Sequence, residues 1–361
     1  MARIKRILII QTAFIGDVIL TMPLLQVLKD FFVDAAIDIV VVPRSAEVCL
    51  THASLNNVVA YDKRGRDRGV RGFIRMAANL RRREYDLALV PHRSLRSALL
   101  ALCAGIPLRI GFAKGAGRFL FNKRIPYDDS LHEIERNLSL LRAIGIAPPA
   151  RELPQIVPGS EAEAEVDGLM TGTGWRRKQA MVAVAPGTVW NTKRWLKERF
   201  AELAGMFAEE GFRVVLVGGP EDEDLCEQIR RASGSDMVVS AAGKLSLLGS
   251  AELIRRCDLV VSNDSAPLHL SVGVGTPVVA IFGATVPEFG FAPYGPHDAV
   301  VEVRGLSCRP CSIHGGAECP IGTFDCMKGI SAERVYARAM TVLEKARSAR
   351  KTKIESVGKK P

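Results

Sequence analysis

The stretch Leu259-Val260-Val261-Ser262-Asn263-Asp264-Ser265 decides the fold of this 361-residue chain. Its apolar half is typical of a buried parallel strand, and its last three residues are types that begin helices. A helix that begins here directs unpaired backbone N–H groups and the positive end of its dipole beyond the strand. At the carboxyl edge of an α/β sheet, a nucleotide phosphate binds at such a position. Asp264 and His269 are therefore candidate site residues, although capping alone also explains Asp264 and burial explains His269.

Short apolar runs alternate with helical patterns on both sides of this stretch, as expected for parallel sheets with right-handed crossovers. In the first half we predict strands at 7–10, 37–42, 58–61, 86–90 and 108–111, and helices at 17–31, 44–52, 70–83, 94–103 and 130–144. In the second half we predict strands at 181–185, 213–217, 237–240, 259–261 and 278–282, and helices at 197–210, 222–232, 246–256 and 266–274. The fold class is therefore α/β, with two doubly wound domains that face each other across a cleft.

A segment rich in proline and glycine at 147–159, followed by an acidic helical stretch, separates the two halves. We expect a first domain at 1–155, a linker at 156–178 and a second domain at 179–330. The second domain carries a cysteine-rich loop at 304–329. A helix at 331–348 is expected to pack back toward the first domain, and a basic tail at 349–361 is expected to be disordered.

Composition is that of a large globular protein. Hydrophobic residues make up 48% of the chain, and the apolar run at 7–10 is too short for a signal peptide or a membrane span. The eight cysteines are spread through the chain without a secretory signal, which favours reduced thiols and a cytoplasmic protein.

The net charge is +10, and it is concentrated in the first half and in the tail. Nine basic residues lie between Lys63 and Arg83, against Asp67 as the one carboxylate. Such clusters attract nucleic acid, acidic lipid headgroups or phosphorylated glycans, or they form a solvated surface. Nucleic acid is disfavoured, because the basic stretch has no interleaved aromatic residues and matches no reader motif.

The first strand–helix turn, Ile10-Gln11-Thr12-Ala13-Phe14-Ile15-Gly16-Asp17, carries the first candidate catalytic group. It has neither the three glycines of a dinucleotide-binding turn nor the Gly-Lys-Ser/Thr of a phosphate loop. Asp17 stands at the start of the helix. It suits a general base that accepts a proton from a hydroxyl, and it equally suits a partner for the helix dipole.

Further candidates follow the strands of the second half. Thr188 and Lys193 leave the first strand and suit a diphosphate, because a hydroxyl donates to an oxygen and an ammonium offsets charge. Asp222 follows Gly218-Gly219 at the end of the next strand and suits a ribose. Leu245 lies between a later strand and helix, where it suits the side of an adenine ring. Several such segments at one sheet edge predict a nucleotide site.

Four cysteines, Cys308, Cys311, Cys319 and Cys326, lie in the loop 304–329. Four thiols at short spacing suggest a structural zinc or an iron–sulfur cluster, but their spacing matches no standard pattern of either kind. A catalytic metal has no support in the sequence.

Taken together, these motifs resemble glycosyltransferase family 9, the ADP-heptose:lipopolysaccharide heptosyltransferases, over nearly the whole chain. The matching strings are Ile15-Gly16-Asp17-Val18, Ala185-Pro186-Gly187, Lys193-Arg194-Trp195, Asn263-Asp264-Ser265-Ala266-Pro267-Leu268-His269, Gly275-Thr276-Pro277 and Phe282-Gly283-Ala284-Thr285. The segment Ala292-Pro293-Tyr294-Gly295 and the cysteine loop look most like the heptosyltransferase II branch. Two positions depart from some relatives, which carry Gly at Ala266 and a second hydroxyl residue at Val189.

The resemblance implies a GT-B fold and inverting, metal-independent transfer of a heptose from an ADP-heptose donor to the inner core of lipopolysaccharide. Asp17 would be the general base. The donor-binding residues would be Thr188, Lys193, Asp222, Leu245, Asp264, Ser265, Ala266 and His269. The basic face of the first domain would meet the acidic acceptor at the inner membrane, through Arg64, Arg66, Arg93, Arg96, Lys114 and Arg118. No cofactor would be required for catalysis, and the protein would be cytoplasmic and peripheral to the membrane.

Alternatives stay open at this point. The chain resembles both the first and the second heptose-transfer enzymes, and another nucleotide-sugar transferase of the same fold fits the same motifs. A dehydrogenase is disfavoured by the absent glycine fingerprint. A protein that binds a nucleotide or glycolipid without catalysis is disfavoured by the presence of Asp17, Lys193 and Asp264. The sequence predicts no oligomeric state.

Overall fold

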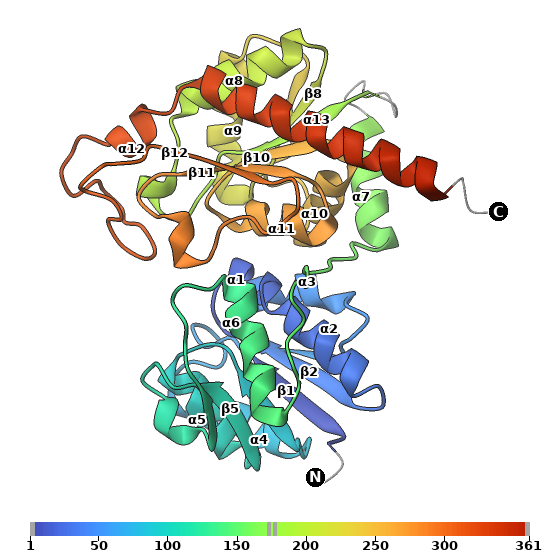
Figure 1. The fold of residues 1–361 in the computed structure, drawn as a ribbon, viewed down its shortest axis with the longest axis vertical. Coiled ribbons are helices and arrows are strands. Elements are labelled where there is room, and N and C mark those ends of the chain that lie inside the picture. Colours follow the sequence, from blue (N-terminus) through green and yellow to red (C-terminus); the bar gives the residue numbers. More distant parts are fainter. Residues whose placement is uncertain (1–3, 172–174, 176–178, 358–361) are drawn as a thin grey trace. The chain divides into compact units, whose positions relative to one another are not determined.

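The computed structural model describes residues 4–171, 175 and 179–357, and the chain divides into two compact units, Met1–Val157 (unit 1) and Pro158–Pro361 (unit 2) (Figure 1). Each unit contains one six-stranded sheet in which all neighbouring strands are parallel. The boundary falls close to the end of the first domain predicted from the sequence.

Unit 1 alternates strands and helices from Arg6 onward. Its strands are β1 (Arg6–Ile10), β2 (Ala36–Val41), β3 (Asn57–Ala60), β4 (Leu87–Val90), β5 (Leu108–Phe112) and β6 (Lys123–Ile125). Its helices are α1 (Ile15–Ile19), α2 (Met22–Phe31), α3 (Pro43–Leu50), α4 (Gly69–Arg81), α5 (Leu95–Cys103) and α6 (Glu133–Ser139), with short 3₁₀ turns at Arg118–Leu120 and Leu140–Ile144.

Unit 2 begins with α7 (Ser160–Thr171), which lies in the predicted linker and packs on α10 through its buried residues Ala162, Val166 and Met170. The strands are β7 (Met181–Ala185), β8 (Arg213–Leu216), β9 (Val238–Ser240), β10 (Leu259–Asn263), β11 (Val278–Phe282) and β12 (Ala299–Glu302). The other helices are α8 (Lys197–Glu209), α9 (Glu223–Ala232), α10 (Leu247–Arg256), α11 (Ala266–Val274), α12 (Asp325–Lys328) and α13 (Ala332–Val357), with 3₁₀ turns at Asn191–Lys193, Pro220–Asp222 and Pro287–Phe289.

The two sheets have the same strand order when each is followed from the edge formed by the third strand of its unit. The order is β3-β2-β1-β4-β5-β6 in unit 1 and β9-β8-β7-β10-β11-β12 in unit 2. In both, the first strand of the unit lies in the middle and the connections reverse direction beside it. Ligands of doubly wound sheets bind at this reversal, outside the carboxyl ends of the strands. The candidate sites are therefore the loops after β1 and β4 in unit 1, and after β7 and β10 in unit 2.

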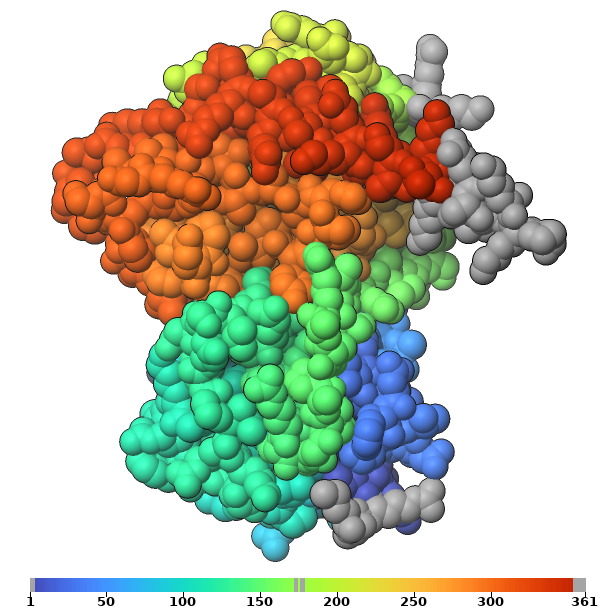
Figure 2. All heavy atoms as spheres, viewed as in Figure 1, coloured from blue at the N-terminus to red at the C-terminus, as the bar shows by residue number. Residues whose placement is uncertain are grey.

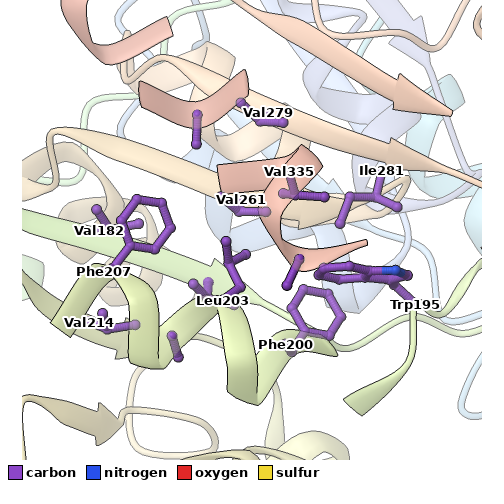
Figure 3. Packing of buried hydrophobic residues seen from close by; sticks show 14 of the residues in the cluster. Val182, Trp195, Phe200, Leu203, Phe207, Val214, Val261, Val279, Ile281 and Val335 are labelled. Carbon is purple, nitrogen blue, oxygen red and sulfur yellow. The ribbon is translucent and has the colours of Figure 1, made fainter. Parts of the chain in front are cut away.

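The core of unit 2 lies between its sheet and the helices α8 and α13 (Figure 3). Trp195 is 1% exposed, packs edge-on against Phe200 with ring centroids 4.8 Å apart, and donates from Nε1 to the carbonyl of Ile330 at 3.1 Å. The same cluster includes Leu203 from α8 and Val335 from α13. This packing fixes the loop that leads from β7 into α8, on which Thr188 and Lys193 are found.

The last helix, α13, packs on unit 2, where it contacts α8, β10, β11 and β12 and lies along the surface (Figure 2). It continues to Val357 and so includes the first residues of the predicted tail 349–361. Between 343 and 351 the helix carries Leu, Glu, Lys, Ala and Arg, which are strong helix formers, with Ser348 as the one exception. Residues 358–361 lie outside the described residues. Over the described residues, no helix is both long and apolar enough to cross a membrane.

Candidate functional site

The two loops at the reversal point of unit 2 are joined by Asn263, the last residue of β10. Its Nδ2 donates to the carbonyl of Pro186 at 2.8 Å, and its Oδ1 accepts from the backbone N–H of Trp195 at 3.0 Å. Asn263 is fully buried, so these bonds are protected from competition with water. The amide thereby ties the loop after β7 to the loop after β10, and sequence analysis assigned this residue no role.

Lys193 and Asp264 meet directly in this region. Lys193 Nζ lies 2.7 Å from Asp264 Oδ2, and the two side chains are only 14% and 7% exposed. Thr285, three residues after the end of β11, donates from Oγ1 to the same carboxylate oxygen at 2.6 Å. The structure thus brings together two residues predicted for the donor site and adds Thr285, whose signal was its place in the string Phe282-Gly283-Ala284-Thr285 after a strand.

Ser265, Ala266 and His269 lie at or near the start of α11. Ser265 is the N-cap in extended backbone, but its side chain makes no capping bond and lies 3.5 Å from Ser262 Oγ. His269 is buried in the helix. A nine-residue helix that begins at the carboxyl edge of the sheet provides the N–H groups and the dipole end that stabilise an anion.

Asp222 lies against the loop after β7. A Cβ atom added to Gly187 would clash with the Asp222 carboxylate, so this close approach requires glycine at position 187. Burial raises the pKa of Asp222, and Arg194, whose Nη2 donates to the carbonyl of Thr188 at 3.0 Å, opposes the shift. Leu245 is half-buried just before α10. Asp222 thus lies beside Gly187, the residue that precedes Thr188.

In unit 1, Asp17 is half-buried in α1 and accepts from the backbone N–H of Phe14 at 3.1 Å through Oδ2. This is a capping contact, so at least one carboxylate oxygen of Asp17 stabilises the start of helix α1. The residue follows β1, and it therefore stands at the reversal point of the unit 1 sheet. Capping fixes the carboxylate at this edge and is compatible with a role in proton transfer.

A second carboxylate, Glu133, interacts with Asp17. Glu133 is 6% exposed, and its Oε2 accepts from Tyr127 Oη and from Arg136 Nη1, both at 3.0 Å. Burial and the negative charge of Asp17 raise the pKa of Glu133, while Arg136 and Tyr127 act in the opposite direction. Asn137, one turn further along α6, donates to the C-cap carbonyl of α1 at 3.1 Å, which holds the two helices side by side.

A polar cluster joins the loops after β1, β3 and β4. Thr12 Oγ1 lies 3.1 Å from His92 Nδ1 and 3.2 Å from Ser97 Oγ, and His92 Nδ1 lies 3.0 Å from Ser97 Oγ. Lys63 donates from Nζ to the carbonyl of Thr12 at 2.6 Å. Burial, with the cations Lys63 and Arg93, lowers the pKa of His92 to about 4, so its ring is neutral at physiological pH. This cluster was not predicted from the sequence, where the position of His92 just after a strand was the available signal.

The basic residues predicted to bind the acceptor have different surroundings. Arg93 and Lys114 lie over the ring of Tyr127, at 4.2 and 5.2 Å from its centroid, and Lys114 also pairs with Asp129 at 2.6 Å. Arg96 donates to Tyr61 Oη at 2.6 Å and holds the loop after β3. The others are exposed: Arg64, Arg66, which lies 3.7 Å from Asp67, and Arg118, which lies over Phe119 at 4.1 Å.

The four cysteines of the loop 304–329 have dissimilar environments. Cys326 is buried in the core of unit 2, whereas backbone N–H groups, that of Phe324 first, lower the pKa of the Cys319 thiol. Within the described residues, which include all four cysteines, no group of three or more His, Cys, Asp or Glu side chains is arranged to hold a metal ion. A structural zinc or iron–sulfur site therefore stays a prediction of the sequence.

Comparison with known proteins decides the family. Residues 73–319 match the family described as glycosyltransferase family 9 (heptosyltransferase), which is more than half of the chain. The chain belongs to this family. Lipooligosaccharide heptosyltransferase 2 of Haemophilus influenzae is 28% identical over 308 residues, which cover 78% of this family 9 glycosyltransferase and 84% of that protein. Lipopolysaccharide heptosyltransferase 2 of Salmonella typhimurium is 27% identical over 294 residues, with 79% and 84% covered.

Solved structures agree with the fold of this glycosyltransferase. A glycosyl transferase family 9 protein of Veillonella parvula superposes with a TM-score of 0.86 and 25% identity, over 94% of this chain and 98% of that one. The ADP-heptose LPS heptosyltransferase II of Escherichia coli superposes with a TM-score of 0.77 and 25% identity, over 95% and 99%. The predicted α/β fold of the GT-B class is confirmed, and so is the assignment to the heptosyltransferase family.

Proposed function

We propose that this glycosyltransferase transfers a heptose from ADP-L-glycero-β-D-manno-heptose to heptose–Kdo2–lipid A, with inversion and without a catalytic metal. The observation that carries the proposal is the Lys193–Asp264 pair at the start of α11, in a chain that matches heptosyltransferases 2 over most of its length. The similarity to a structure named as ADP-heptose LPS heptosyltransferase II supports the donor.

Unit 2 would bind the donor. Lys193 and Thr188 would contact the diphosphate, together with the N–H groups of Ser265 and Ala266 at the start of α11. Asp222 would bind the ribose, Leu245 would line the adenine and Asp264 would hold the heptose, with His269 behind it. The close approach of Asp222 to Gly187 supports a site built from several loops of one sheet edge.

Unit 1 would bind and activate the acceptor. A hydroxyl oxygen of the acceptor attacks the anomeric carbon of the heptose while Asp17 accepts the hydroxyl proton. The bond between that carbon and the diphosphate oxygen breaks, and ADP departs with the electron pair. A single displacement of this kind inverts the anomeric centre.

The departing ADP needs charge stabilisation, which a metal ion supplies in many phosphoryl and glycosyl enzymes. In this protein the Lys193 ammonium and the dipole of α11 are available for that task. We therefore expect transfer to continue at an unchanged rate in excess EDTA.

The test is to incubate the purified protein with ADP-heptose and either heptose–Kdo2–lipid A or Kdo2–lipid A, and to weigh the products by mass spectrometry. A gain of one heptose on the first acceptor supports the proposal, and a gain on the second alone would assign the first heptose transfer instead. Parallel reactions with UDP- and GDP-sugars check the donor. Failure to release ADP with any acceptor would favour a protein that binds without catalysis.

Asp17→Asn tests the base. We expect turnover to fall by about 10²–10⁴-fold while ADP affinity stays within twofold of the unaltered protein, because the base acts on the acceptor. Full turnover would contradict the assigned role of Asp17, and lost ADP binding would make it a donor contact.

Because the proposed acceptor is anchored in a membrane, the protein would act at the surface of an anionic bilayer. Helix α4 has a suitable face: Val70 and Ile74, one turn apart, are 73% and 59% exposed. Arg68, the N-cap of α4, and Arg71, next to Val70, are exposed and form no ion pair with the described residues. Apolar side chains that enter the headgroup region and arginines that meet anionic lipids are the usual components of peripheral binding.

Vesicle sedimentation tests this surface. The protein should bind vesicles that contain phosphatidylglycerol and not pure phosphatidylcholine vesicles, and Val70→Ser with Ile74→Ser should weaken binding several-fold. The matched control exchanges Leu50 for Ser, an exposed apolar residue at the end of α3. Unchanged binding of the double variant would show that α4 is not the contact.

A further inference from the structure

The cysteine-rich loop 304–329 has no part in the transfer proposed above, yet it is bonded to the donor side of unit 2. The first connection joins Thr192 to Gly316. The backbone N–H of Thr192 donates to the carbonyl of Gly316 at 3.1 Å, and the N–H of Gly316 donates to Thr192 Oγ1 at 2.8 Å. Thr192 is 2% exposed, so this pair of bonds is shielded from water.

The second connection is a packing contact with Lys193 itself. Gly315 has a φ of +85°, and a Cβ atom added to it would lie 3.0 Å from Lys193 Cγ and 3.1 Å from Lys193 Cδ. The backbone of Gly315 therefore lies directly against the aliphatic stem of the lysine. Any larger residue would push on the stem that carries the ammonium group.

The third connection reaches Asp264 through Thr285. Arg309 donates from Nη2 to the carbonyl of Thr285 at 2.7 Å, and Thr285 Oγ1 donates to Asp264 Oδ2 at 2.6 Å. Glu302, at the end of β12, holds the Arg309 guanidinium at 2.9 Å. The backbone N–H of Cys311 also donates to the carbonyl of Ala284 at 2.9 Å.

We propose that the cysteine-rich loop is a positioning element of the donor site, which holds Lys193 and Asp264 in the geometry that the diphosphate of a nucleoside diphosphate sugar requires. The inference rests on the proposed donor role of unit 2. The loop supports both partners of the ion pair, Lys193 through Gly315 and Asp264 through Arg309 and Thr285. None of these loop residues needs to touch the donor.

The physical reason lies in the freedom of a lysine side chain. Fixing its four rotatable bonds costs conformational entropy, and an unsupported lysine would lose that entropy when the donor binds. Backbone packed against the stem removes part of this cost before the donor arrives. Donor affinity should therefore depend on a loop that lies more than a hundred residues away in the sequence from Lys193.

The first experiment compares Gly315→Ala with Gly322→Ala by calorimetric titration with ADP. Gly322 lies in the same loop with a φ of +75°, and a Cβ atom there would meet nothing within 4 Å. Both variants carry the same kind of backbone strain, so the contacts of the new Cβ atom with Lys193 and with Thr192 Oγ1, at 3.1 Å, distinguish them. We expect ADP binding to weaken about tenfold in Gly315→Ala and less than twofold in Gly322→Ala, the difference expected when a bond to a charged group is misplaced.

A second pair of variants leaves the backbone unaltered. Thr192→Val removes the acceptor for the Gly316 N–H, and Thr192→Ser retains it. We expect Thr192→Val to raise the KM for the donor about fivefold, with the acceptor KM unchanged, and Thr192→Ser to restore the donor KM. If the bonds between Thr192 and Gly316 only stabilise the fold, Thr192→Val should instead lower the fraction of active protein and leave the KM values for donor and acceptor unchanged.

The outcomes separate the two levels of the proposal. If the unaltered protein does not bind ADP, the donor role of unit 2 is wrong and this inference falls with it. If the unaltered protein binds ADP while Gly315→Ala matches Gly322→Ala, or while Thr192→Val keeps the donor KM, the positioning role alone is overturned.

Discussion

Lys193 and Asp264 form an ion pair that is largely shielded from water, and its two members depend on each other. A buried pair gives little net stability, but the loss of one partner leaves an uncompensated charge. The same pair is the centre of the proposed donor site, so its disruption has two measurable effects.

We predict that Lys193→Met lowers the free energy of unfolding by about 3 kcal/mol, because the buried Asp264 carboxylate loses its cation. The double variant Lys193→Met, Asp264→Asn should recover most of that stability and none of the ADP affinity. Urea unfolding and ADP titration measure the two quantities. Equal stability of Lys193→Met and the unaltered protein would show that Thr285 alone compensates Asp264.

His92 supplies a prediction about pH. Its pKa in the folded protein is about 4, against an ordinary value of 6.5, so between these values the unfolded chain binds the extra proton. The contribution of His92 to the free energy of unfolding is therefore fully present above pH 6.5, and it is lost as the pH decreases toward 4. We expect this residue to account for about 2–3 kcal/mol of that loss, and His92→Gln to flatten the profile.

The control for this profile is His314→Gln, in which an exposed ring is replaced. Urea unfolding between pH 4 and 7 should give the unaltered slope for this variant. If His92→Gln also keeps the unaltered slope, another group is responsible for the acid sensitivity.

At the scale of single residues, the sequence identified those that lie in recognisable strings at strand ends. Lys193 and Asp264 form an ion pair, and Asp222 reaches the loop that contains Thr188, while their roles in donor binding stay predictions. The cluster around His92 was missed, because it joins the loops after β1 and β4, which are distant in the sequence. Spacing along one chain segment carries no information about such contacts.

Among the elements, the loop from β7 into α8 depends on the packing of Trp195. We predict that Trp195→Ala lowers the free energy of unfolding by about 3–5 kcal/mol, because it empties a fully buried site next to Phe200 and leaves the Ile330 carbonyl without its donor. Trp195→Phe should cost less, since it retains most of the packing. Thermal unfolding measures both, and similar losses would mean that the hydrogen bond dominates.

Long apolar elements were predictable and short polar ones were not. The buried strands β1, β2, β7, β10 and β11 lie where the apolar runs indicated. The strand β6 was missed because two of its three residues are exposed and charged. The predicted helix 17–31 is divided into α1 and α2 at Leu20 and Thr21, where hydrophobic periodicity continues without a break.

At the scale of the whole molecule, each unit has its own sheet and its own hydrophobic core. Domains of this kind unfold as separate cooperative units when each core is complete. The donor is proposed to bind unit 2, so it should stabilise that unit selectively.

We predict that ADP at 100 times its dissociation constant stabilises unit 2 by about 2.7 kcal/mol and leaves the local stability of unit 1 unaltered. Hydrogen exchange, followed separately for peptides of residues 4–157 and 179–352, measures the two effects. Equal protection of both units would show that they unfold together or that ADP also contacts unit 1.

Gly315 and Gly316 contact the β7–α8 loop through their own main-chain atoms. Side chains elsewhere in that segment, such as Ile313 and Ile321, point into solvent and contribute nothing to these contacts. Random mutagenesis with selection for activity should therefore return a segment that accepts almost any exchange at its solvent-facing positions, interrupted by an intolerant site at Gly315.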